Sequence, residues 1–153
     1  MLQDRFGRTI DYLRISVTDR CDLRCAYCIP KGFRGFEIPQ SWLTIDEIAR
    51  VVRVFASMGT KRIRLTGGEP LLRKDLTELV GNLRSIDGVE DLSLSTNATR
   101  LAIHAYDLKR AGLDRINVSL DSLRGECVQQ ITGNDSLPKV LHGLRIAKGA
   151  GFS

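Results

Sequence analysis

The sequence predicts an α/β fold: a partial (β/α) TIM-like barrel of parallel strands with outer helices. Short segments of period two alternate with longer amphipathic segments, which is the pattern of repeated strand–helix units with right-handed crossovers. Each strand-like segment has a polar side, whereas the central strands of an open doubly wound sheet are apolar on both sides. The chain has 153 residues, well below the roughly 250 of a complete eight-unit barrel. We therefore expect a single domain, residues 1–153, truncated at about four βα units.

Four segments alternate like half-buried strands, and their polar sides indicate the kind of ligand. They are residues 12–18, 62–66, 91–95 and 115–120. The side chains expected on the polar side are Arg14, Ser16, Thr18, Arg62, Arg64, Thr66, Ser93, Ser95, Asn97, Asn117, Ser119 and Asp121. A surface this polar cannot be the filled core of an ordinary barrel. It fits a curved sheet whose concave side holds water and a large polar ligand.

The segments between the strands have helical periodicity, and several carry terminal signals. A capping box of Thr44 and Glu47 opens the first helix, and Gly59 ends it. The further expected helices are residues 75–84, 101–111, 126–131 and a last one with Pro138 in its first turn. Residues 31–42, rich in glycine and proline, are expected to be an irregular connection.

The composition is that of an ordinary globular protein. The chain is 42% hydrophobic and 27% charged, with a formal net charge of +5. This charge suits an anionic ligand, is too modest to indicate nucleic acid, and is equally typical of a plain protein surface. No apolar segment approaches membrane-spanning length, and the first ten residues lack the pattern of an export signal. The cytoplasm is therefore the expected location.

Three cysteines, Cys21, Cys25 and Cys28, follow the first expected strand, and Cys127 is remote in sequence. So short a loop cannot be a disulfide framework, and cysteines in a chain without an export signal indicate metal or redox chemistry. Three thiolates can hold an Fe–S cluster and leave one iron without a protein ligand, open to a small molecule. The alternative is a closed structural zinc site completed by Cys127 or a histidine.

A second motif, Gly67-Gly68-Glu69-Pro70, ends the second expected strand. Taken alone, it would more often be a plain turn. The glycines lack Cβ atoms, so we expect backbone here to approach a ligand closely, and we expect Glu69 to lie near a ligand's ammonium group. No phosphate-binding loop or dinucleotide-binding pattern occurs in the sequence.

Together, Cys-x3-Cys-x2-Cys with an aromatic residue before the third cysteine and the following Gly-Gly-Glu-Pro resemble the radical S-adenosylmethionine (SAM) superfamily. Within it, residues 13–21, 64–73 and 115–121 closely resemble the N-terminal half of the GTP 3′,8-cyclase family, which starts molybdenum cofactor biosynthesis. The resemblance runs from Phe6 to the last residue and recurs at each expected strand.

The resemblance implies that Cys21, Cys25 and Cys28 hold a 4Fe–4S cluster whose open iron is chelated by SAM. Reductive cleavage of SAM gives a 5′-deoxyadenosyl radical, which abstracts the ribose 3′ hydrogen of GTP so that the new radical attacks C8. By position, Tyr27, Gly68 and Ser119 match SAM-binding residues, and Arg14, Arg64 and Ser95 match residues that contact GTP. Guanidinium groups suit a triphosphate because their donors are forked and permanently charged. No catalytic side chain is assigned.

Departures from the family pattern limit what the resemblance implies. The family binds a second 4Fe–4S cluster through three cysteines of its C-terminal part and has a C-terminal Gly-Gly tail, and this sequence matches neither. Ala98 stands where the family has glycine. We therefore expect the radical-generating half of such an enzyme.

The expected partners are GTP as substrate and an external electron donor, with no nucleic acid and no membrane. Self-association, for example as a homodimer, would cover the open edge of a truncated barrel. Two alternatives remain: another radical SAM enzyme such as a peptide-modifying maturase, or a non-enzymatic Fe–S or zinc binding module. A maturase would share the cysteine loop but should lack Arg14 and Arg64 in these settings, and a separate alternative is that the two arginines are surface residues of exposed strands.

Overall fold

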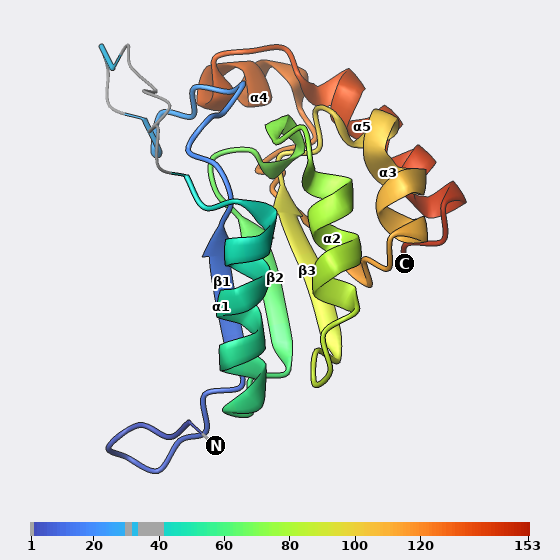
Figure 1. The fold of residues 1–153 in the computed structure, drawn as a ribbon. Coiled ribbons are helices and arrows are strands. Elements are labelled where there is room, and N and C mark those ends of the chain that lie inside the picture. The colour runs from blue at the N-terminus through green and yellow to red at the C-terminus, as the bar shows by residue number, and fades with distance from the viewer. Residues whose placement is uncertain (1, 30–31, 34–41) are drawn as a thin grey trace.

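The computed structural model describes residues 2–29, 32–33 and 42–153, and its centre is a four-stranded parallel sheet (Figure 1). The strands are β1 (Tyr12–Ser16), β2 (Arg62–Thr66), β3 (Asp91–Thr96) and β4 (Arg115–Val118). They lie side by side in the order of the chain, β1-β2-β3-β4. A doubly wound sheet reverses its order at a switch point, whereas this sheet is wound in one direction, as in a barrel. The predicted fold class is confirmed.

Helices follow every strand, as predicted. They are α1 (Ile45–Ser57), α2 (Leu76–Arg84), α3 (Leu101–Arg110), α4 (Gly125–Thr132) and α5 (Leu137–Gly149), with a short 3-10 helix η1 (Pro70–Leu72) that the sequence did not indicate. The expected capping box is formed, because Glu47 N donates to Thr44 Oγ1 at 3.3 Å and Thr44 N donates to Glu47 Oε2 at 2.8 Å. The connection predicted for residues 31–42 lies almost entirely outside the described residues. Within those, no helix combines the length and apolarity needed to cross a membrane.

The apolar side of the sheet and the helices form one core. Ile63, Leu65, Leu92 and Leu94 are fully buried, and they belong to the same cluster as apolar residues of α1, α2, α3 and α5. Figure 1 shows α1 and α2 in front of the sheet, with α3 and α5 beside it. The alternation in the strands therefore sorts their side chains as predicted, with the apolar side facing the helices.

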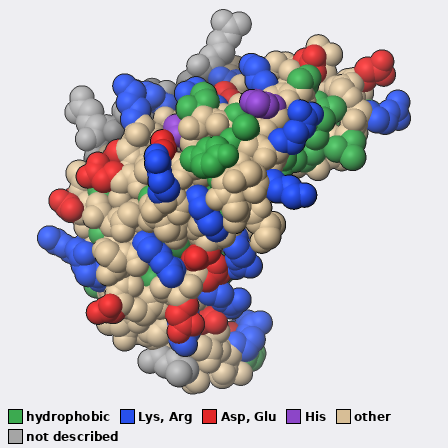
Figure 2. Space-filling model, turned by 90° about the vertical axis from the view of Figure 1, so that its right-hand side faces the viewer, with side chains coloured by type: hydrophobic (Ala, Val, Ile, Leu, Met, Phe, Trp, Pro, Cys, Tyr) green, Lys and Arg blue, Asp and Glu red, His purple; other side chains and the backbone are tan. Residues whose placement is uncertain are grey.

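The opposite side of the sheet carries polar side chains in rows that the register fixes. Arg14 pairs with Arg64, Arg64 with Ser93, and Ser93 with Arg115. Figure 2 views the molecule from the α3 and α5 side, and its outline is hollowed at the right, with Lys and Arg side chains beside the hollow. The expected concave polar surface is thus present.

One buried hydroxyl, that of Thr60 between α1 and β2, has no hydrogen-bond partner in the described part of the chain. Thr60 is 1% exposed. Since an unpaired buried hydroxyl is costly, replacing Thr60 by valine, which has nearly the same shape, should raise the free energy of unfolding by about 1 kcal/mol.

Thr132 provides the matched control for this prediction. Its hydroxyl is also buried and donates to Val128 O at 2.8 Å, while Asn134 N donates to it at 3.3 Å. Thr132→Val should therefore lower the free energy of unfolding by about 1 kcal/mol. Urea denaturation of both variants checks the pair, and destabilisation by both would contradict the account of Thr60.

Candidate active site

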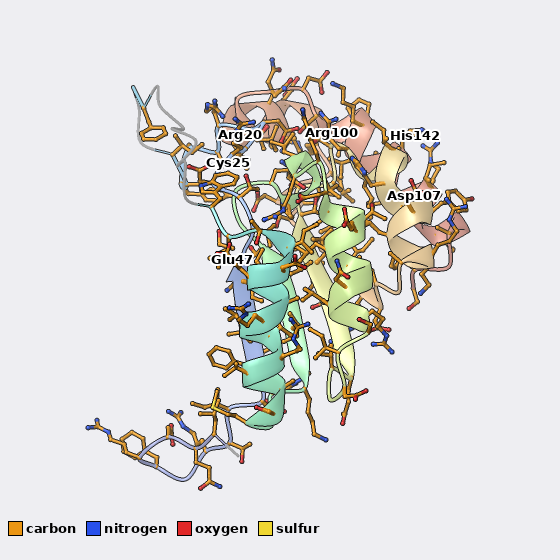
Figure 3. The ribbon with its side chains drawn as sticks, in the orientation of Figure 1. Arg20, Cys25, Glu47, Arg100, Asp107 and His142 are labelled. Atoms are coloured by element: carbon orange, nitrogen blue, oxygen red, sulfur yellow. The ribbon has the colours of Figure 1, made fainter. Side chains whose placement is uncertain are left out.

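The cysteine loop leaves the carboxyl end of β1 and is anchored to the end of α4. Arg24 N donates to Thr132 O and Ala26 N donates to Ile131 O, each at 2.9 Å. Figure 3 labels Cys25 and Arg20 in this loop, above the end of β1. Loops at the carboxyl ends of parallel strands are where α/β proteins build their sites, so the predicted cluster loop occupies the functional end of the sheet.

The three cysteines of the loop are free thiols. Cys21 and Cys25 are half-buried and Cys28 is exposed. Burial raises the pKa of the Cys21 thiol, and burial also raises the pKa of Cys25. Soft sulfur ligands in this number fit an Fe–S cluster, and their thiolate forms would bind it.

The described residues contain no ready-made group of three or more Cys, His, Asp or Glu side chains at metal-binding distances. The three sulfurs must therefore converge when a cluster binds. A closed zinc site would require a fourth side chain to converge with the three sulfurs, so the structure favours it less than a cluster with three ligands. Figure 3 shows His142 on α5, at the opposite side of the view from Cys25.

Gly67 and Gly68 touch the backbone of the cysteine loop. A Cβ atom added to Gly67 would lie 2.2 Å from Thr18 O, and one added to Gly68 would lie 2.2 Å from Arg20 O. Gly68 N donates to Thr18 O at 2.8 Å, and Glu69 N donates to Arg20 O at 2.7 Å. The absence of Cβ atoms at these positions therefore lets the cysteine loop dock on this turn through main-chain hydrogen bonds, and the approach of a ligand stays a prediction.

Gly68→Ala should consequently push the cysteine loop away from β2. Gly68 does not have a left-handed backbone, so the effect is the steric clash alone, and we expect a loss of roughly 1 to 3 kcal/mol in the free energy of unfolding. Gly81, inside α2, is the control, because a Cβ there meets nothing within 4 Å. Gly81→Ala should stabilise the protein by about 0.5 to 1 kcal/mol. Thermal unfolding of both variants measures the difference, and a neutral Gly68→Ala would contradict the docking.

Glu69 is fully buried and joins the ends of β2 and β3. Its Oε1 accepts from Leu71 N at 3.0 Å and from Thr96 Oγ1 at 2.6 Å, and its Oε2 accepts from Asn97 N at 2.7 Å. Burial raises the pKa of this carboxyl, while these donors oppose the rise. Three of the four acceptor positions of Glu69 are thus occupied by hydrogen bonds within the chain, which leaves one for the ligand ammonium group that the sequence analysis expects nearby.

Asn97 carries this connection from the sheet to the cysteine loop. Its side-chain amide donates to Asp22 Oδ1 at 2.8 Å and lies 3.9 Å from Cys21 Sγ. Thr99 Oγ1 donates to the other Asp22 oxygen at 2.6 Å. Sequence reasoning placed Asn97 on the polar side of the sheet but did not indicate this link to the first cysteine, because the two are far apart in sequence.

Ala98, which stands where the family has glycine, has a left-handed backbone with φ 62°. Few residues other than glycine adopt this conformation without strain. Ala98 is fully buried, its N–H donates to Thr96 Oγ1 at 2.9 Å, and Gly143 of α5 packs against its carbonyl. The family glycine is thus explained by the backbone conformation of this turn.

The residues predicted to bind SAM lie around the cysteine loop but not all in one cavity. Gly68 lines a cavity of about 440 Å³ together with Cys21 and Cys28. Tyr27 is exposed, and its hydroxyl donates to Asp121 Oδ2 at 3.0 Å, two residues beyond the exposed Ser119. Burial and the bond to Asp121 raise the pKa of Tyr27. This hydrogen bond connects the cysteine loop to the end of β4, and no local pattern in the sequence indicates it.

The residues predicted to contact GTP lie on the polar side of the sheet, where two arginines differ from their neighbours. Arg62 is paired with Asp11 at 2.7 Å, and Arg115 is paired with Asp91. Within the described residues, the Arg64 guanidinium forms a 3.4 Å hydrogen bond with Ser93 and lies over the Tyr12 ring, 5.4 Å from its centre, with no acidic partner.

Arg14 has no hydrogen-bond or ion-pair partner among residues 2–29, 32–33 and 42–153, although it pairs directly with Arg64 in the sheet. Ser95 lies further toward the carboxyl end, beside Asn117. Two like charges that face each other across neighbouring strands repel. A bound anion between Arg14 and Arg64 would therefore relieve this repulsion.

Residues 15–153 match the radical SAM superfamily. The chain belongs to the radical SAM superfamily. It is 46% identical over 151 residues to the GTP 3′,8-cyclase of Stenotrophomonas maltophilia strain K279a, covering 99% of this chain and 46% of that relative. It is 48% identical over 152 residues to the GTP 3′,8-cyclase of Listeria welshimeri, again with 99% and 46% coverage. The chain thus spans about half the length of the curated relatives it matches.

Solved structures support the fold. The hydrogenase maturase HydG aligns with a TM-score of 0.73 at 18% identity, over 92% of this chain and 33% of that one. Native anSMEcpe with bound AdoMet aligns with a TM-score of 0.72 at 20% identity, over 93% of this chain and 41% of that one. Membership of the radical SAM superfamily confirms the two predicted cofactors, a 4Fe–4S cluster and SAM. Which residues of this radical SAM chain bind them stays a prediction.

Proposed function

We propose that this chain is the radical-generating part of a GTP 3′,8-cyclase, the first enzyme of molybdenum cofactor biosynthesis. Relatives of that name match along 99% of the chain. The single observation that carries the substrate class is the neighbouring pair Arg14 and Arg64, whose guanidiniums are not neutralised by an acidic residue of the described chain. A peptide-modifying enzyme would have no need of two such arginines for a triphosphate.

The chain's residues divide into three groups in this proposal. Cys21, Cys25 and Cys28 would hold the cluster, which when bound supplies the electron that cleaves SAM to a 5′-deoxyadenosyl radical. Gly68, Tyr27 and Ser119 would line the SAM site at the carboxyl ends of β1, β2 and β4.

Arg14 and Arg64 would bind the triphosphate through charge-assisted hydrogen bonds, and Ser95 would add a hydroxyl nearer the loop. In this proposal the substrate would lie between Arg14 and Arg64 and the cysteine loop. There the ribose 3′ hydrogen would meet the radical, and C8 of the purine would receive the resulting carbon radical. The chemistry requires an external one-electron donor.

The product pattern tests the proposal. The anaerobically reconstituted chain is supplied with GTP, SAM and a strong reductant, and the products are analysed by mass spectrometry. We expect 5′-deoxyadenosine, and no 3′,8-cyclo-GTP, because the family's second cluster has no ligands in this sequence. Detection of 3′,8-cyclo-GTP would show that this chain suffices for cyclisation, and the division of roles proposed here would be wrong.

A further inference from the structure

Arg73, at the end of η1, ties together three segments around the cysteine loop. Its Nε and Nη2 donate to the two carboxylate oxygens of Asp75, at 2.7 and 3.2 Å. Its Nη1 donates to Val17 O at 3.1 Å, and its Nη2 also donates to Leu43 O at 3.4 Å. The Arg73 side chain is only 10% exposed, so a charged group is buried here for these contacts.

The two carbonyls that Arg73 binds lie at the two ends of the segment that connects β1 to α1. Val17 extends the pairing of β1 with β2, since Val17 N donates to Thr66 O at 2.9 Å, and the cysteine loop begins directly after it. Leu43 immediately precedes Thr44, the N-cap of α1. Between them lie Cys21, Cys25 and Cys28. A single guanidinium therefore holds together the two ends of the segment that carries all three cysteines.

We propose that Arg73 is a positioning residue for the cluster-binding loop. A planar guanidinium can bind a carboxylate with two donors and still reach carbonyl oxygens, which a lysine ammonium on a flexible stem does poorly. The carboxylate of Asp75 fixes the plane of the guanidinium, and the hydrogen bond with Arg73 lowers the pKa of Asp75. Holding both ends of this segment removes conformational freedom that the three sulfurs would otherwise lose when they converge on a cluster.

The consequence is specific to the loop and can be separated from general stability. Arg84 provides a control, because like Arg73 it binds one carboxylate, and it binds one carbonyl where Arg73 binds two. Its Nη1 donates to Asp114 Oδ2 at 3.1 Å and to Glu90 O at 3.5 Å, at the end of α2. Arg73→Met and Arg84→Met each keep most of the apolar stem and lose one guanidinium. Only the first should loosen the cysteine loop.

Two measurements test whether the cysteine loop has loosened, and the first of them uses the protein without a cluster. In the apo-protein, the amides of Gly68 and Glu69 report whether the loop is docked, because they donate to Thr18 O and Arg20 O. Arg73→Met should speed their hydrogen exchange by about tenfold, and Arg84→Met should leave it unchanged. In the reconstituted protein, iron release to a chelator should be faster for Arg73→Met than for wild type and Arg84→Met.

The iron-release measurement rests on the proposed function, because it needs a bound cluster. The hydrogen-exchange measurement does not, so the two can fail separately. Equal exchange of these amides in all three proteins would overturn the inference, even if the cluster forms. A wild-type chain that binds no cluster would contradict the proposed function. Hydrogen exchange of the Gly68 and Glu69 amides would still test whether Arg73 positions the loop. If Arg73→Met does not fold, Arg73→Lys and Asp75→Asn test the same contacts with milder changes, and wild-type exchange in both would contradict the positioning role.

Discussion

Replacing Cys21 by alanine should abolish cluster binding by the anaerobically reconstituted protein. Cys21, Cys25 and Cys28 are free and lie in one loop at the carboxyl end of β1. With one thiolate removed, two sulfurs remain for a cluster that needs at least three protein ligands here, so the loss should be complete rather than partial. Iron and sulfide analysis measures it directly.

Cys127→Ala is the matched control for this loss. Cys127 is half-buried on α4 and is also a free thiol. Its replacement should leave the iron content at the wild-type level of about four per chain. Equal loss of iron in Cys21→Ala and Cys127→Ala would reject the three-ligand cluster and would favour a site that all four cysteines share.

Removing either arginine of the pair on the polar side should weaken GTP binding. Arg14 and Arg64 are neighbours in the sheet, and neither forms a salt bridge within the described chain. Each would lose charge-assisted contacts to the triphosphate worth roughly 1.5 to 3 kcal/mol, which is more than a tenfold loss of affinity. Calorimetric titration of Arg14→Ala and Arg64→Ala with GTP measures the change.

Arg62→Ala serves as the control, because Arg62 also belongs to β2 but its guanidinium is already held by Asp11 at 2.7 Å. Its removal should change GTP affinity much less. GTP affinities unaltered in both Arg14→Ala and Arg64→Ala would show that these side chains do not meet the ligand, and the substrate class proposed here would lose its main support.

The sequence predicted the layers of this fold well, because the physics that fixes them is local. Period-two alternation decides which side of each strand faces the helices, and Ile63, Leu65, Leu92 and Leu94 are buried accordingly. Capping and glycine signals located the helix ends. The 3-10 helix η1 could not be foreseen in this way, because three residues are too short for any period.

The connections between the strand ends were not predictable from the sequence. The close approach of a ligand to Gly67 and Gly68 stays a prediction, but the sequence did not indicate that backbone oxygens of Thr18 and Arg20 lie 2.2 Å from the missing Cβ positions. Likewise, the bond between Tyr27 and Asp121 spans 94 residues. Contacts of this kind depend on how distant segments meet in space, and no local pattern encodes them.

The central claim is that the cysteine loop holds a 4Fe–4S cluster with an iron open to SAM. Electron paramagnetic resonance of the reduced, reconstituted chain, recorded before and after addition of SAM, tests it most directly. The account predicts the spectrum of a reduced 4Fe–4S cluster whose g-values shift when SAM is added, and no such spectrum for Cys21→Ala. A cluster spectrum that SAM leaves unchanged would contradict the open iron, and with it the proposed radical chemistry.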